Sequence, residues 1–157
     1  MGLLGQHSPA IVHLREASRL RPTAATHVNL AQVLLQDSKT DEAIAELRNA
    51  MALSPEWSVP PASLSWIFSS HPDESIRRPA EAITLAERAV TLATANEAML
   101  RDAMAAAYAS AGRFAEAVVT AEQAAAIARR AGVPALAGQI EQRLELYRRR
   151  RPYVQPH

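Results

Sequence analysis

Residues 43–55 read AIAELRNAMALSP, and residues 10–22 read AIVHLREASRLRP. The two stretches share an Ala-Ile start, a Leu-Arg pair, a second alanine seven residues after the first, and a closing proline. Weaker copies begin at Ala82 and Ala117, so the four first alanines lie 33, 39 and 35 residues apart. Self-similarity at such a period indicates a repeat protein, in which each copy is one supersecondary unit.

Each of the last three copies is preceded by a second apolar pattern with i, i+1, i+4 spacing, which places three side chains on one helical face. The unit is therefore predicted to be helix, short turn, helix, short turn. Alanines seven residues apart on the second helix let paired helices approach closely, and Pro22 and Pro55 end their helices. The three trios are Leu30, Ala31 and Leu34; Leu64, Ser65 and Phe68; and Met104, Ala105 and Tyr108.

These features resemble the tetratricopeptide repeat. The segment from Asn29-Leu30-Ala31 to Pro55 looks like a complete copy, and Gly112–Ala117 looks like the turn and second-helix start of another. The resemblance implies an all-α fold, a right-handed superhelical stack of antiparallel helix pairs with a C-terminal capping helix. The chain is similar to the C-terminal end of repeat arrays that are common in bacteria.

We expect a single domain, with an enlarged turn over Ser69–Pro79 in its third unit. The capping helix is expected over Pro134–Arg150, and Gly112 is expected to adopt a left-handed conformation at a helix end. The predicted parts are 1–22 (partial repeat), 23–55, 56–94 and 95–131 (repeats), 133–151 (capping helix) and 152–157 (tail).

The composition narrows the function classes. Hydrophobic residues make up 48% of the 157 residues, which excludes a disordered chain, and there is no cysteine for disulfides or thiolate chemistry. No apolar run reaches the roughly 18 residues that a membrane span needs, and no catalytic, cofactor or metal-binding motif is present. We therefore expect a cytoplasmic protein that is not an enzyme and has no cofactor, metal or membrane contact.

The resemblance also implies a binding site. In such superhelices the first helix of each pair lines a concave groove, where a partner peptide or helical segment is held. The neutral to mildly apolar groove argues against an acidic tail as ligand. Its expected residues are Val28, Gln32, Gln36, Trp66, Met99, Asp102, Ala106 and Ser110.

Trp66 is the sharpest candidate because an exposed tryptophan is a common interface anchor. The alternative is that Trp66 packs under the Ser69–Pro79 insertion as local core. Residues 1–128 hold 10 basic and 14 acidic residues, whereas residues 129–157 hold 7 basic and 2 acidic ones. A basic patch confined to one end argues against nucleic-acid binding, for which Arg148–Arg151 is the one candidate.

Three functions stay open at this point. The first is a scaffold that binds a protein or peptide in its groove. The second is the repeat tail of a larger enzyme, such as a glycosyltransferase or kinase, because the pattern begins in mid-repeat. The third is self-association through the open face of the first helix, expected over Ser8–Leu20.

Overall fold

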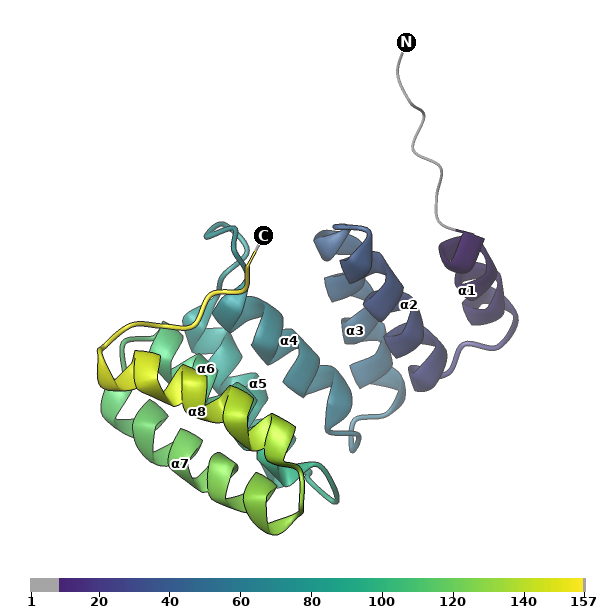
Figure 1. The fold of residues 1–157 in the computed structure, drawn as a ribbon. Coiled ribbons are helices and arrows are strands. Elements are labelled where there is room, and N and C mark those ends of the chain that lie inside the picture. Colours follow the sequence, from purple (N-terminus) through teal and green to yellow (C-terminus); the bar gives the residue numbers. More distant parts are fainter. Residues whose placement is uncertain (1–8, 157) are drawn as a thin grey trace. The chain divides into compact units, whose positions relative to one another are not determined.

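The computed structural model describes residues 9–156, and within them the chain forms helices and no strand (Figure 1). The described helices are α1 (Pro9–Leu20), α2 (Ala24–Gln36), α3 (Thr40–Leu53), α4 (Val59–Ser70), α5 (Pro79–Thr91), α6 (Glu97–Ser110), α7 (Phe114–Arg130) and α8 (Pro134–Arg148). The all-helical fold class is therefore confirmed.

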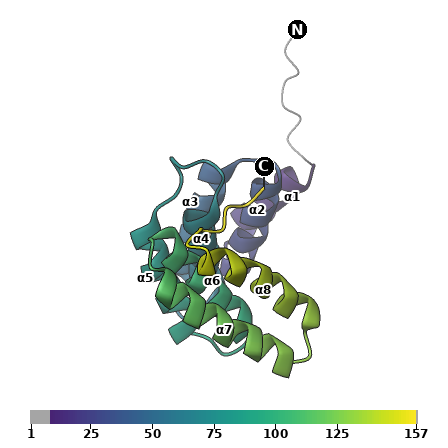
Figure 2. The ribbon, with the colours of Figure 1, turned by 60° about the vertical axis from the view of Figure 1, so that its left-hand side comes forward.

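The chain divides into two compact units, one ending at Pro60 and the other beginning at Pro61, inside α4. In the first unit, α2 packs against both α1 and α3. In the second unit, α6 packs against α5 and α7, and α8 lies along α7 (Figures 1 and 2). The expectation of a single domain, and the repeat boundaries within it, stay predictions.

The repeated alanines of the second helices lie at the centre of the packing. Their side chains are fully buried, which agrees with the close helix approach inferred from their seven-residue spacing. They come from α3, α5 and α7, and the nine alanines of these helices whose exposed fraction is 0% are Ala43, Ala50, Ala82, Ala86, Ala89, Ala117, Ala121, Ala124 and Ala128.

Four helix ends share one turn. The residue with positive φ is Ser38 (59°), Gly112 (77°), Gly132 (73°) or Arg150 (56°), and the next amide donates to a carbonyl five residues back. This bond satisfies a carbonyl that the helix end leaves without a helical partner. The left-handed conformation expected at Gly112 is confirmed, while the same conformation at Ser38 and Arg150 had no glycine to indicate it.

Two boundaries differ from expectation. Helix α8 ends at Arg148, two residues before the predicted end, because Arg150 adopts the left-handed conformation. The enlarged turn is a loop over 71–78, in which the amide and hydroxyl of Ser75 donate to the Asp73 carboxylate at 2.9 and 2.8 Å. These bonds lower the pKa of Asp73. The first residue of the expected Ser8–Leu20 helix lies outside the described residues.

Candidate functional site

The structure separates the eight predicted groove residues into accessible and covered ones. Gln32, Gln36 and Met99 are exposed, and Trp66 and Ser110 are partly exposed. The covered ones are Val28, Asp102 and Ala106, with exposed fractions of 4%, 4% and 2%. In this conformation a ligand cannot contact those three side chains from solvent.

Val28 is buried for a different reason than Asp102 and Ala106 are. Since α2 has neighbours on two sides, α1 and α3, its buried arc is wider than the Leu30 trio alone and includes Val28. Asp102 lies on α6, and α8 packs against that helix. The expectation that Val28, Asp102 and Ala106 face a ligand is corrected on this point, because these side chains belong to the interior.

Asp102 forms a buried ion pair with α8. The Arg143 guanidinium donates from Nε to Oδ1 at 3.1 Å and from Nη2 to Oδ2 at 2.5 Å. Burial raises the pKa of Asp102, and the hydrogen bonds from Arg143 oppose that rise. The neighbouring Tyr147 hydroxyl is buried with no hydrogen-bond partner among the described residues, and burial also raises the pKa of Tyr147. This corner of the second unit is a buried polar junction.

An aromatic cluster adjoins this junction. The ring of Trp66, on α4, lies 5.6 Å from the ring of Tyr153, centroid to centroid, with the planes tilted by 39°. The Arg143 Cζ atom lies 5.3 Å from the Trp66 centroid and 5.4 Å from the Tyr153 centroid. Distances under about 6 Å permit a cation–π attraction. Trp66 therefore contacts the C-terminal segment of the chain, a partner that neither sequence interpretation had named.

The same segment is tied to the C-terminal end of α4. The Gln155 amide donates to the Ser70 carbonyl at 2.8 Å, and Gln155 Nε2 donates to Ser70 Oγ, also at 2.8 Å. The Ser70 hydroxyl in turn donates to the Trp66 carbonyl at 2.6 Å. We call Trp66, Ser70 and Arg143 together the Trp66 surface.

Sequence reasoning missed Ser70, Arg143, Tyr153 and Gln155. Each lies outside the repeat pattern or on its polar side, so periodicity carried no signal for them. In the structure, Tyr153 and Gln155 of the C-terminal segment are partly buried while their neighbours are exposed. A period of two is typical of extended chain with one covered side.

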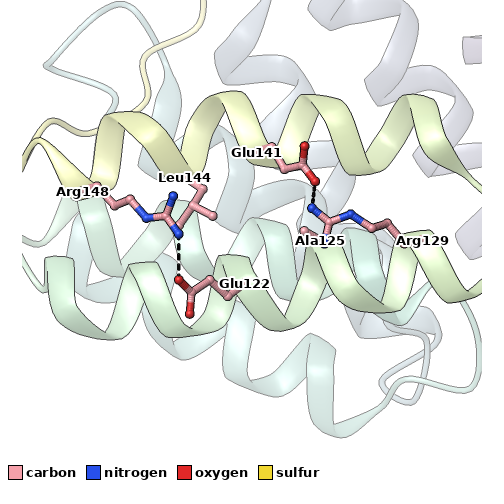
Figure 3. Close-up of a pocket in the computed structure, with 6 residues that line it drawn as sticks. All are labelled: Glu122, Ala125, Arg129, Glu141, Leu144 and Arg148. Carbon is pink, nitrogen blue, oxygen red and sulfur yellow. Dashed lines mark hydrogen bonds and ion pairs between the residues drawn. The ribbon is translucent and has the colours of Figure 1, made fainter.

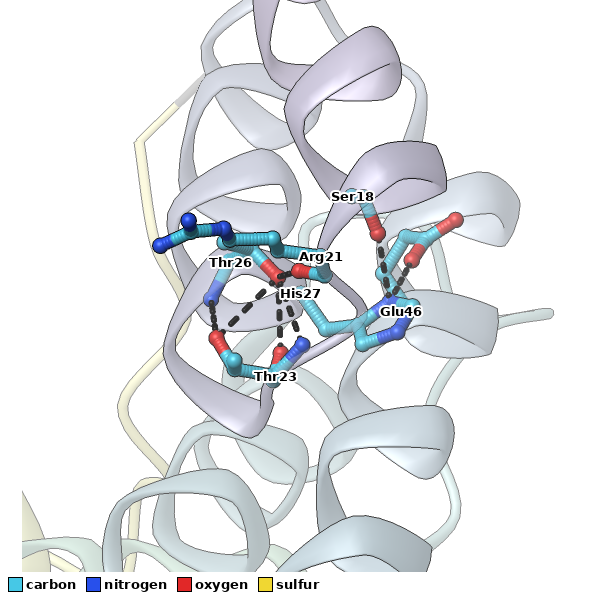
Figure 4. A network of polar contacts seen from close by, with 6 residues as sticks. All are labelled: Ser18, Arg21, Thr23, Thr26, His27 and Glu46. Atoms are coloured by element: carbon cyan, nitrogen blue, oxygen red, sulfur yellow. Dashed lines mark hydrogen bonds and ion pairs between the residues drawn. The ribbon is translucent and has the colours of Figure 1, made fainter.

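The first unit holds a polar network that superficially resembles a catalytic triad (Figure 4). His27 Nδ1 lies 2.5 Å from Glu46 Oε2 and 3.4 Å from Ser18 Oγ. Both contacts use one ring nitrogen, whereas a triad needs the serine and the acid on opposite nitrogens. The network joins α1, α2 and α3, and beside it Thr23 caps α2 by accepting from the Thr26 amide at 3.2 Å. Its geometry fits a structural role.

A pocket of about 260 Å³ lies between α7 and α8 (Figure 3). Two ion pairs cross it, Arg148 Nη2 to Glu122 Oε1 at 2.9 Å and Arg129 to Glu141. Ala125 and Leu144 also line it. The paired charges leave no excess of either sign, so the pocket has no feature that selects a ligand.

The basic run at the end of α8 is largely engaged within the second unit. Arg148 pairs with Glu122, Arg149 Nε pairs with Glu145 Oε1 at 3.2 Å, and the Arg150 Cζ atom lies 5.6 Å from the centroid of the Phe114 ring. Among residues 9–156, no cluster of three potential metal-binding side chains occurs. None of the described helices has the length and apolar character to span a membrane.

Residues 24–56, which contain α2 and α3, match the family model described as tetratricopeptide repeat. No curated protein matches the chain. The matched segment coincides with the repeat copy that the sequence pattern placed at Asn29–Pro55, and its two helices pack together as a repeat requires. The chain therefore contains a tetratricopeptide repeat, over residues 24–56.

Proposed function

We propose that this protein is an interaction module that binds an extended segment of a partner protein on the Trp66 surface. Tetratricopeptide repeats generally mediate protein–protein interaction, and the family is typically a non-catalytic scaffold. The observation that supports this particular surface is that it already holds an extended polypeptide, residues 153–155, by ring contact and hydrogen bonds.

The hydrogen bonding favours an extended ligand over a helical one. The Ser70 carbonyl accepts a main-chain amide from Gln155, whereas the amides inside a helical ligand are already used within that helix. A partner segment in extended form keeps its amides available for this carbonyl.

A peptide selection tests this proposal. The purified 157-residue chain is presented with a random heptapeptide library, and dissociation constants are measured for the enriched peptides. Because aromatic anchors carry much of the energy of an interface, Trp66→Ala is expected to weaken these peptides at least about tenfold. The matched control is Trp57→Ala, the same change at the other tryptophan, which is expected to leave affinity within about twofold.

The helical content of both variants is checked by circular dichroism before binding is compared. Enriched peptides that bind the Trp66→Ala protein as tightly as the wild type would show that the Trp66 surface is not the binding site. Failure to enrich any peptide, both on the wild type and on a variant in which Tyr153 and Gln155 are replaced by serine so that the C-terminal segment releases the surface, would contradict the proposal as well.

A further inference from the structure

We propose that residues 151–156 are a built-in occupant of the Trp66 surface, and that the partner segment which displaces them carries an aromatic residue followed two positions later by a side-chain amide. This inference rests on the proposed function and adds the chemistry of the partner and the regulation of its access.

The turn after α8 directs the chain back across the second unit. Arg150 adopts a left-handed conformation with φ of 56°, and the Arg151 amide donates to the Leu146 carbonyl at 2.9 Å. From there the C-terminal segment, drawn in yellow, runs from the end of α8 to the C-terminal end of α4 (Figures 1 and 2). The segment forms no helix, and it lies on the face that carries Trp66.

Alternate residues of this segment face the surface. Tyr153 and Gln155 are partly buried, whereas Pro152, Val154 and Pro156 are exposed. In extended chain, residues two apart lie on the same side. Two side chains and one main-chain amide therefore make the described ring and hydrogen-bond contacts with the Trp66 surface, and this pattern transfers to any extended ligand with the same spacing.

The aromatic position is recognised by two groups together. Tyr153 has the Trp66 ring on one side and the Arg143 guanidinium within 5.4 Å of its centroid. Since the ring quadrupole attracts a cation, an aromatic residue is favoured here over an aliphatic one of similar size. Arg143 is itself held by Asp102, so the cation is fixed in place before a ligand arrives.

The amide position is recognised by the state of the Ser70 hydroxyl. A serine hydroxyl has one hydrogen to donate, and Ser70 uses it on the Trp66 carbonyl. Its oxygen can therefore only accept, and it accepts from Gln155 Nε2. A carboxylate has no hydrogen to donate at neutral pH, so the surface selects glutamine or asparagine against glutamate or aspartate.

Tethering makes the segment a competitor of the partner. A segment joined by a short linker acts at an effective concentration of about 1 mM, so a free peptide with the same contacts is outcompeted at lower concentrations. Only two side chains, Tyr153 and Gln155, anchor the segment, and its other residues are exposed. The free energy needed to detach the segment locally is therefore low. A partner segment with the same pattern and additional contacts is expected to displace it.

The test uses the full chain and a fluorescent peptide of residues 151–156, Arg-Pro-Tyr-Val-Gln-Pro. The released variant is Tyr153→Ser with Gln155→Ser, and its matched control is Val154→Ser at an exposed position of the same segment. By anisotropy, the released variant is expected to bind the peptide at least about tenfold more tightly than the wild type and the control. Peptides with Gln replaced by Glu, or Tyr by Leu, are expected to bind the released variant at least about tenfold more weakly.

Several results would overturn the inference. Equal affinity of wild type and released variant would show that the segment does not block the surface. A released variant that loses stability without gaining peptide affinity would show that the segment only caps α4. A wild-type dimer that exchanges C-terminal segments, seen by light scattering, would assign the surface to a second copy. Equal binding of the Gln and Glu peptides would remove the amide specificity.

A further variant separates this inference from the proposed function. If Trp66→Ala weakens the library peptides but the released variant does not bind the peptide of residues 151–156, the proposed interaction surface is supported and the built-in occupant is wrong. If adding Trp66→Ala to the released variant leaves every peptide bound as before, both proposals fail.

Discussion

Asp102 shows at the scale of one residue how a polar side chain changes role when its environment is known. The repeat pattern in the sequence predicts Asp102 to be the one acidic side chain of the groove. In the structure it accepts two hydrogen bonds from Arg143, 41 residues further along the chain, and its exposed fraction is 4%. The pair holds the guanidinium beside Trp66 and Tyr153, so Asp102 acts on the Trp66 surface through Arg143.

Asp102 predicts a particular pH dependence of stability. Because burial raises its pKa in the folded state, the folded protein binds this proton more tightly than the unfolded chain does. Its contribution to stability is therefore fully present below the unfolded pKa of about 4 and is lost as pH rises through the folded pKa. Urea melts of wild type and Asp102→Asn are compared from pH 3 to pH 7. As the pH rises, the free energy of unfolding of the variant is expected to increase relative to that of the wild type, because only the wild type loses this contribution.

The comparison isolates one carboxyl group. Glu16, Asp73 and Glu116 have lowered pKa values, which act in the opposite direction, but they are the same in both proteins and cancel. A difference between the two proteins that stays constant with pH would contradict the assignment of this titration to Asp102.

Helix ends decide the connections at the scale of elements. After α6 and α7 the positive φ falls on glycine, whereas after α2 and α8 it falls on Ser38 and Arg150. A left-handed conformation costs a residue with a Cβ atom roughly 1 kcal/mol. At Arg150 the turn leads the chain to α4, and the hydrogen bonds that the Arg151 and Gln155 amides donate to Leu146 and Ser70 offset that cost.

Two glycines allow a matched prediction with opposite signs. Gly112 has φ of 77° and nothing within 4 Å of an added Cβ, so Gly112→Ala costs only the backbone strain, about 1 kcal/mol. Gly138 lies within α8 with nothing within 4 Å either, so Gly138→Ala is expected to stabilise by about 0.5–1 kcal/mol. Chemical denaturation with unchanged m-values checks both. A shift of the two midpoints in the same direction would contradict the conformational argument.

At the scale of the whole molecule, each of the two units is built from helices that pack mainly on their neighbours in the chain. In the second unit α6 packs against α5, α7 and α8, while in the first unit α1 packs on α2. Stability in repeat proteins is approximately a sum of local terms. Resistance to local opening therefore follows the number of neighbours that each helix has within its unit.

Native-state hydrogen exchange tests this distribution. Amides in the middle of α6 and α7 are expected to exchange most slowly, because their helices are covered by buried alanines on more than one side. Amides of α1 are expected to exchange at least about tenfold faster, since fewer contacts must open. Equal protection of α1 and α6 would indicate one cooperative unit instead of local openings.

The sequence by itself determined the helical repeat, the buried alanines and the left-handed turn at Gly112. These features depend on periodic side chains and on packing between helices that are neighbours in the chain, so a local pattern is enough to encode them. Gln32, Gln36, Met99, Trp66 and Ser110 were placed on accessible or partly accessible positions by the same pattern.

Only the tertiary structure decided which side chains form the Trp66 surface. Arg143 reaches Asp102 across 41 residues, and Gln155 reaches Ser70 across 85 residues. Neither contact has a counterpart in the repeat, because the first depends on the packing of α8 against α6 and the second on the left-handed turn that redirects the chain at Arg150. The burial of Asp102, and the meeting of Tyr153 with Trp66, follow from that placement in space and not from any local pattern.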